Sequence, residues 1–225
     1  MYSPMRITNK VLALAIASFF VLSCSRDGVE FAREEVPSME EYEPVADFLQ
    51  LQVGNYWVYE SFSIDLETGE ETPLYKRDSI FVRKDTLIGR LAYFVLEGSH
   101  LGQDYRAVLR CSGPEAMDAE GHLLFSTAAI GDTAQLPANL LANGAISGDY
   151  CLHETKEVEV PYGTFGALEY RRTFYFSSSE AIKVGDNTRH QSDFYARGIG
   201  LIQYTSFFPN LPMDIEMRLV RCKVQ

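Results

Sequence analysis

Short runs of aromatic and β-branched residues, separated by turn residues, fill the chain from residue 48 to its end. Some of these runs alternate in polarity, as Val158 and Val160 do with Glu157 and Glu159. Alternation of this kind is typical of a strand with one buried face. The pattern predicts about nine or ten strands, over residues 56–64, 79–87, 91–97, 105–111, 123–127, 155–160, 166–177, 193–196, 201–208 and 213–224.

The connections between these runs are short. Residues 88–90 (Ile-Gly-Arg) predict a hairpin turn, and no helical crossover separates successive strands, which favours antiparallel pairing. Only Leu136 to Asn143 has helical character, and it ends at an Asn-Gly pair. We therefore predict one all-β, mainly antiparallel domain over residues 48–225. It would be a curved sheet, an open barrel or a sandwich, with at most one or two short helices.

The first 23 residues have the pattern of an export signal. Arg6 and Lys10 precede an apolar run, Val11 to Leu22, in which only Ser18 is polar. This run is shorter than the roughly 20 residues of a membrane-spanning helix and suits a secretory signal. A buried hydrophobic hairpin or a first strand is the alternative interpretation of this run. Residues 21–24 (Val-Leu-Ser-Cys) resemble a bacterial lipobox, which implies that Cys24 is lipidated and anchors the chain to a membrane.

The residues after Cys24 bear on the location. Ser25 replaces the aspartate associated with inner-membrane retention, which implies delivery to the outer membrane. Residues 24–27 (Cys-Ser-Arg-Asp) also resemble the surface-export signal of Bacteroidetes-type lipoproteins, although Gly28 stands where a second acid would strengthen the match. A surface-exposed position is favoured, and a position facing the periplasm stays open.

Residues 24–47 are predicted to form a flexible acidic tether. The segment is rich in glutamate, contains Pro37 and Pro44, and shows no sustained helical or strand period. Acidic segments of this kind repel themselves and stay extended, with an end-to-end distance on the order of 25 Å. The acids lack the alternating spacing of a calcium loop, so a solvated linker is the favoured interpretation.

The charge balance limits the partners. The 225 residues carry 20 basic and 31 acidic side chains, for a formal net charge of −11. Phosphate binding needs a basic face, so nucleic acid is excluded as a general partner. The expected partners are a membrane, through the N-terminal lipid, and a protein or a glycan.

Three motifs resemble a known family. They are residues 51–60 (Leu-Gln-Val-Gly-Asn-Tyr-Trp-Val-Tyr-Glu), 160–165 and 198–202. The chain is similar there to uncharacterised outer-membrane or surface lipoproteins of the Bacteroidetes type, which have a VGNYWVYE-like first strand. The resemblance implies a shared fold and location, and no activity. The residues themselves favour structural roles, with Trp57 in the core and Gly198 and Gly200 at a bulge or bend.

Motifs that carry chemistry are scarce. The chain contains no Gly-x-Ser-x-Gly elbow, His-Glu-x-x-His pair, phosphate loop or dinucleotide fingerprint. The best metal-like spacing, Cys151 and His153 beside Glu154, falls short of the four ligands of a closed zinc site. We expect no catalytic residue, no metal and no cofactor. A hydrolase built from paired carboxylates is the least favoured alternative.

The remaining cysteines are candidates for a disulfide, and one aromatic segment is a candidate for a binding surface. Apart from Cys24, the cysteines are Cys111, Cys151 and Cys222, and any two of them could form a disulfide in an exported protein. Buried free thiols are the alternative.

The candidate binding surface mixes aromatic rings with arginines and comprises Tyr170, Arg171, Arg172 and Tyr175. Inward rings with outward arginines would explain this segment equally well.

Three function classes follow. The favoured one is a non-catalytic interaction or ligand-binding module at the outer membrane or cell surface, with an exposed aromatic patch and a filled core. The alternative is a carrier for a lipid or another apolar small molecule, which predicts an apolar cavity of several hundred Å³. An enzyme would bring acids or histidines together in a cleft.

Overall fold

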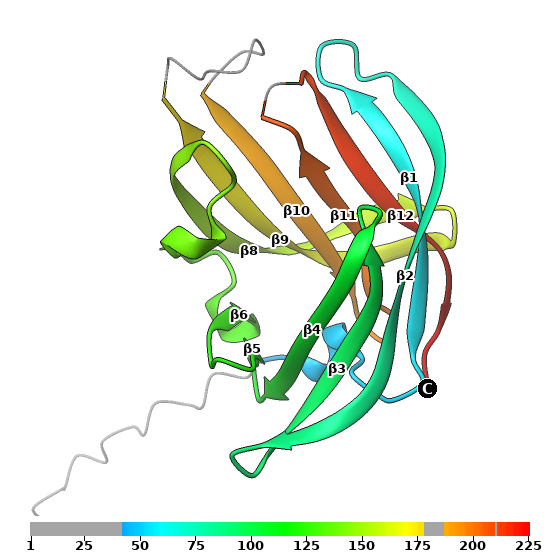
Figure 1. The fold of residues 1–225 in the computed structure, drawn as a ribbon, viewed down its shortest axis with the longest axis vertical. Helices are drawn as coiled ribbons and strands as arrows, with labels where there is room; N and C mark the ends of the chain where they lie inside the picture. Colours follow the sequence, from blue (N-terminus) through cyan, green and yellow to red (C-terminus); the bar gives the residue numbers. More distant parts are fainter. Residues whose placement is uncertain (1–41, 178–186, 210) are drawn as a thin grey trace, which may run out of the picture. The chain divides into compact units, whose positions relative to one another are not determined.

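The computed structural model describes residues 42–177, 187–209 and 211–225. These residues form one antiparallel sheet of 12 strands in the order β6-β5-β4-β3-β2-β1-β12-β11-β10-β9-β8-β7 (Figure 1). The chain therefore meanders outwards from β1 on one side and returns towards β12 on the other. The sheet does not close, because β6 and β7 lie at its two ends. The predicted all-β, mainly antiparallel architecture is confirmed.

The strands run from 3 to 18 residues. They are β1 (Tyr56–Asp65), β2 (Glu71–Ile88), β3 (Leu91–His100), β4 (Gln103–Ser112), β5 (Glu115–Asp118), β6 (Leu123–Ser126), β7 (Thr133–Gln135), β8 (Ala145–Val160), β9 (Gly163–Phe176), β10 (Thr188–Ala196), β11 (Gly200–Phe207) and β12 (Met213–Lys223). The short helices are α1 (Ala46–Leu49) and the 3-10 turns η1 (Thr127–Ala129) and η2 (Ala138–Leu140).

Two details differ from the sequence-based expectation. The helix expected over Leu136 to Asn143 is reduced to the single turn η2, which begins directly after Pro137. Strands β5 and β7 were not expected, because 4 and 3 residues are too few to establish an alternating pattern. The hairpin expected around residues 88–90 is present, with Ile88 paired to Leu91.

Bulges curl the sheet around a concave face. The register shifts between Val58 and Tyr59 on β1, and again on β2, β8 and β10. The curl brings together strands that are not neighbours in the sheet. His100 at the end of β3 stacks on Tyr204 of β11, with ring centroids 4.5 Å apart, although β2, β1 and β12 separate these strands in the sheet order.

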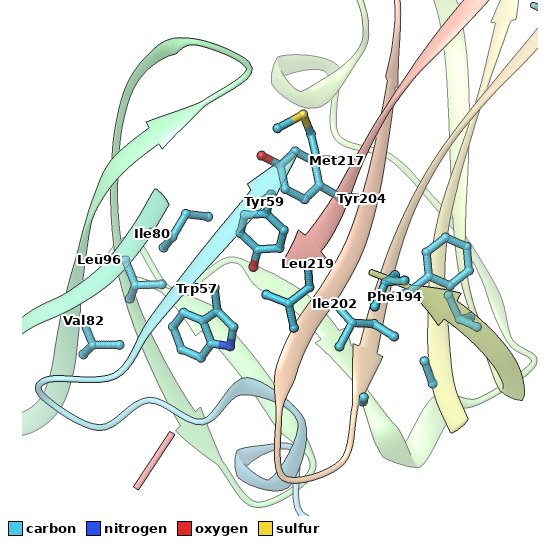
Figure 2. Close-up of a cluster of buried hydrophobic side chains, with 14 residues drawn as sticks. Trp57, Tyr59, Ile80, Val82, Leu96, Phe194, Ile202, Tyr204, Met217 and Leu219 are labelled. Atoms are coloured by element: carbon cyan, nitrogen blue, oxygen red, sulfur yellow. The ribbon is translucent and has the colours of Figure 1, made fainter. Parts of the chain in front are cut away.

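The main core lies along the central strands, where it joins residues from β1, β2, β3, β10, β11 and β12 (Figure 2). Trp57 is 4% exposed and donates a hydrogen bond from Nε1 to the carbonyl oxygen of Ile199 at 2.6 Å. Gly200 lies beside it with φ of +99°, and a Cβ there would come within 3.0 Å of the indole ring. The core role predicted for Trp57 and the bend predicted at Gly200 are therefore both observed.

The segment before β1 packs into a second core. Val45, Phe48 and Leu49 are buried against side chains that include Phe125 of β6 and Leu168 of β9. Ion pairs from Arg197 to Glu43 and Asp47 hold this segment in place. The packed part of the chain thus begins before residue 48, where the sequence analysis placed the end of the tether. Among the described residues, no helix is long and apolar enough to cross a membrane.

The hairpin of β8 and β9 extends across the outer face of the sheet. At its tip the Tyr162 amide donates to the carbonyl oxygen of Leu219 on β12 at 3.0 Å. Val158 and Val160 pack in the same cluster as Phe194 of β10. This covering hairpin buries the outer side of β10, so both faces of that strand are occupied.

Candidate ligand pocket

The concave face holds a pocket of about 640 Å³. The β3–β4 hairpin forms one wall, β9, β10 and β11 form the opposite wall, and α1 and the β5–β6 hairpin contribute at one end. The lining combines aliphatic and aromatic side chains with a small polar group. The lining includes Leu49, Ile80, His100, Tyr105, Arg106, Ala107, Leu109, Asp118, Glu120, Phe125, Tyr170, Arg172, Asp193, Tyr195 and Leu201.

An ion pair lies on the β9–β10 wall. Arg172 Nη2 donates to Asp193 Oδ2 at 2.7 Å, and the two side chains are 28% and 16% exposed. The pairing register explains their proximity. Asp193 pairs with Tyr170, and Arg172 lies two residues further along β9 on the same face of the sheet. Within the described residues, this is the one hydrogen bond to the Asp193 carboxylate, and the buried Arg172 Nε has no acceptor.

Burial dominates the electrostatics of this pair. It raises the pKa of Asp193, and the attraction of Arg172, with that of His100 in its protonated form, only partly offsets this. Burial alone would lower the pKa of Arg172, but the Asp193 carboxylate raises it above its ordinary value. The pair therefore forms a unit of zero net charge in which the carboxylate is incompletely solvated.

Aromatic groups complete the polar part of the pocket. His100 stacks on Tyr105 of β4 at 5.6 Å between ring centroids and on Tyr204 at 4.5 Å. Burial lowers the pKa of His100, so the imidazole is neutral at physiological pH. Burial also raises the pKa of Tyr105 to about 12 and that of Tyr195 well above its ordinary value. These side chains therefore present neutral donors and acceptors.

An apolar hollow adjoins the pocket. It has a volume of about 60 Å³ and shares six lining residues with the larger space, which are Leu49, Ile80, Tyr105, Leu109, Tyr195 and Leu201. Trp57 and Leu96 belong to its lining as well. The concave face thus offers a polar group on the β9–β10 wall and an apolar region towards α1.

The outer face of the same two strands carries a different polar cluster. Glu169 is 4% exposed at its side chain and accepts hydrogen bonds from Lys156, Arg171 and Ser192 at 2.6 to 3.0 Å. Burial raises the pKa of Glu169, but these three donors outweigh it, so the pKa lies below its ordinary value. The Lys156 ammonium also lies over the Phe194 ring at 4.6 Å.

The structure divides the candidate binding surface taken from the sequence. Tyr170 and Arg172 line the concave pocket. Arg171 and Tyr175 point to the outer face, where they contact Glu169 and Asp149. Alternation along β9 causes this separation. The four residues therefore do not form one surface, and two of them belong to the pocket.

The other predicted positions are dispersed. Cys111, Cys151 and Cys222 lie on β4, β8 and β12 as free thiols, and burial raises the pKa of Cys111 to about 11. Cys24 lies outside the described residues. Among the described residues, one group of potential metal ligands comes together at the β5–β6 turn, where donor atoms of Asp118, Glu120 and His122 lie within 4.8 Å of one another. These residues are hydrogen-bonded among themselves, and Glu120 and His122 are exposed.

Most of the pocket residues could not be recognised from the sequence. His100, Tyr105 and Asp193 lie on three strands and share no motif. A weak signal was present, because Asp193 directly precedes the aromatic pair Phe194 and Tyr195 in a predicted strand. A charge at an inward position of an apolar strand is costly and often functional.

Comparison with known proteins finds solved structures of low similarity to this chain. No family model matches, and no curated protein matches. A solved structure of a candidate exported protein with a YmcC-like fold from Bacteroides fragilis is similar, with 14% identity and a TM-score of 0.41, over 78% of this chain and 98% of that one. A candidate lipoprotein from Parabacteroides distasonis aligns with 12% identity and a TM-score of 0.45, over 79% and 99%.

Proposed function

We propose that this chain is an exported, lipid-anchored protein that binds an amphiphilic small molecule in its concave pocket. The observation that carries the proposal is the combination of volume and lining. About 640 Å³ is within the range of small-molecule sites, which are mostly apolar with a few oriented polar groups. The Arg172–Asp193 pair supplies the polar group, and the region towards α1 supplies the apolar part.

The N-terminal sequence supports the location in this proposal. Its signal-like run and the lipobox-like residues before Cys24 favour acylation and an outer-membrane anchor. The acidic segment that follows would hold the domain away from the bilayer. A tethered binding domain suits a protein that takes up or retains a molecule at the membrane surface.

The pocket favours a carrier over an interaction module with a filled core. The module was expected to use Tyr170, Arg171, Arg172 and Tyr175 together, and these lie on two faces. A carrier was expected to contain an apolar cavity of several hundred Å³; the pocket has this size, but its lining also includes the Arg172–Asp193 ion pair. The proposal assigns binding without a catalytic step.

The test uses the unlipidated mature chain, defined here as residues 24–225 with Cys24→Ser. The uncharged fluorescent probe N-phenyl-1-naphthylamine should bind with one-to-one stoichiometry. Ala107→Phe fills the pocket from the β4 wall, and we expect it to weaken probe binding about tenfold or more. The control is Ala92→Phe, an exposed position on β3 outside the pocket, which should leave the affinity unchanged.

Native mass spectrometry of the same preparation, before and after organic extraction, gives a second readout. A retained, extractable mass in the lipid range would support the proposal and provide a first ligand. Failure of the probe to bind, or equal loss with Ala107→Phe and Ala92→Phe, would contradict it.

A further inference from the structure

The charge balance of the pocket indicates which headgroup it accepts. Resting on the proposed function, we propose that the polar end of the bound amphiphile is uncharged and carries hydroxyl groups, as in a glycosyl or glyceryl headgroup. The residues that select it are Arg172 and Asp193, with His100 and Tyr105 facing them across the pocket. This assigns a ligand class to the pocket and a selecting role to one ion pair.

An anionic headgroup is disfavoured by the pair itself. A carboxylate or phosphate that binds Arg172 would have to compete with Asp193, which is 2.7 Å away and 16% exposed. Displacing it would leave a poorly solvated carboxylate without its counter-ion, and removing one member of a buried pair is strongly unfavourable. An ammonium that binds Asp193 faces the same penalty through Arg172.

A hydroxyl avoids this penalty because it donates and accepts at the same time. Its oxygen can accept from the guanidinium while its proton is donated to the carboxylate, so the ion pair stays intact. The pair has unused capacity for such a ligand. Within the described part of the chain, the Asp193 carboxylate accepts only the bond from Arg172 Nη2, so it can accept a further hydrogen bond from a ligand.

The groups around the pair match the same chemistry. Neutral His100 can donate from one ring nitrogen and accept at the other, and the tyrosines Tyr105 and Tyr195 stay protonated. His100 stacks on Tyr105 and on Tyr204, which holds the imidazole in place beside the pair. A cluster of neutral donors and acceptors recognises hydroxyls without imposing a net charge.

Acidic side chains at the rim of the pocket also disfavour anionic ligands. Asp118 and Glu120 lie at the β5–β6 end of the pocket. Arg106 also belongs to the lining, but it faces Glu97, with 3.6 Å between Arg106 Nε and Glu97 Oε1. Among the residues that the structure describes, the charged groups that line the rim therefore do not supply a cation free of an acidic partner for a phosphate or carboxylate.

The experiment is a displacement series on the unlipidated mature chain loaded with N-phenyl-1-naphthylamine. The competitors share a twelve-carbon chain and are kept below their micelle-forming concentrations. Dodecyl maltoside and monolauroylglycerol carry neutral hydroxylated heads, lauric acid and dodecyl phosphate are anionic, and dodecylamine is cationic. We expect a neutral member to displace the probe at about tenfold lower concentration than any charged one. The two neutral members distinguish a glycosyl from a glyceryl source.

Two variants test the selecting role of the pair. Asp193→Asn leaves Arg172 as an unbalanced cation, so we expect the affinity for lauric acid to rise about tenfold. Arg172→Met leaves the carboxylate unbalanced, so we expect dodecylamine to gain relative to lauric acid. The matched controls are Arg171→Met, on the adjacent residue of the opposite face, and Asp149→Asn on that same face. Both control variants should rank the five competitors in the same order of affinity as the wild-type protein does.

The outcomes separate this inference from the proposed function. If the probe binds and lauric acid or dodecylamine is the strongest wild-type competitor, the headgroup inference is wrong while the binding function stands. An unchanged ranking in Asp193→Asn and Arg172→Met would also overturn it. If neither the probe nor any amphiphile binds, the proposed function itself fails.

Discussion

Two buried carboxylates on neighbouring strands differ in their surroundings. Glu169 of β9 points to the outer face and accepts hydrogen bonds from Lys156, Arg171 and Ser192. Asp193 of β10 points to the pocket and accepts from Arg172 alone among the described residues. Burial acts on both, yet the pKa of Glu169 is lowered and that of Asp193 is raised. The acid with complete hydrogen bonding braces the fold, and the acid with incomplete bonding faces the pocket.

The largest expected effect is on stability at the outer face. We expect Glu169→Gln to lower the free energy of unfolding by about 2 kcal/mol, because the amide loses the charge that Lys156 and Arg171 contact. Both partners are more than a third exposed and can be rehydrated, which keeps the loss below that of a fully buried pair.

Urea denaturation of the unlipidated mature chain, followed by the fluorescence of Trp57, would measure this difference. Glu157→Gln, an exposed position on the same hairpin, is the control and should stay within about 0.5 kcal/mol of wild type. Equal stability of Glu169→Gln and the control would show that the outer cluster does not brace the fold.

The second prediction concerns the replacement of the other carboxylate, Asp193, by an amide on the pocket side of the sheet. The raised pKa of Asp193 means that ionising this acid costs more in the folded protein than in the unfolded chain, even with Arg172 present. Asp193→Asn removes this cost and keeps a carbonyl oxygen that can accept from Arg172, although it leaves the guanidinium without its counter-ion, so we expect its free energy of unfolding at neutral pH to stay within about 1 kcal/mol of wild type. A loss as large as that of Glu169→Gln, measured by the same urea titration, would contradict the contrast between the two acids.

The dependence on pH should have opposite signs for the two acids. The folded pKa of Glu169 lies below 4.5, so its stabilising contribution is present above that pH and is lost as the pH falls through the folded pKa. The folded pKa of Asp193 lies above 3.8, so its contribution is present below that pH and is lost as the pH rises through the folded pKa.

Unfolding titrations at a series of pH values would test these signs. The gap between wild type and Glu169→Gln should narrow on acidification from neutral pH. Over the same range, wild type should gain stability relative to Asp193→Asn. A gap that changes in the same direction for both variants would show that the two acids are equivalent.

The sequence revealed the sheet more completely than the pocket, for a physical reason. Strand β12 alternates in polarity from Met213 to Leu219, and β1 begins with a run of aromatic and β-branched residues, so local pattern predicts both strands. Trp57 was placed in the core because a large aromatic ring within such a strand has to be buried. The pocket depends instead on bulges that curl the sheet and bring His100 opposite Asp193. Local pattern contains no information on which distant strands will face each other.

The β9 segment shows how far local pattern reaches. The sequence indicated that the aromatic and arginine residues there bind, or else divide between the two faces of a strand, and the structure shows the division. The sequence does not show which residues of the neighbouring strand lie beside these arginines. Arg172 lines the pocket and pairs with Asp193, which lies beside it on β10. Arg171 stabilises the outer face instead, because Glu169, two positions earlier on β9, points to that same face.

The smallest expected effect concerns Lys156, which is 47% exposed and lies between Glu169 and the Phe194 ring. Lys156→Met keeps the aliphatic stem over the ring and removes the charge, so we expect a loss of about 0.5 to 1 kcal/mol. A double-mutant cycle with Glu169→Gln isolates the contact, and the two changes together should cost less than the sum of the single changes. Strict additivity would mean that Glu169 is held by Arg171 and Ser192 alone. Amphiphile ranking should stay at the wild-type order, because Lys156 lies on the face opposite the pocket.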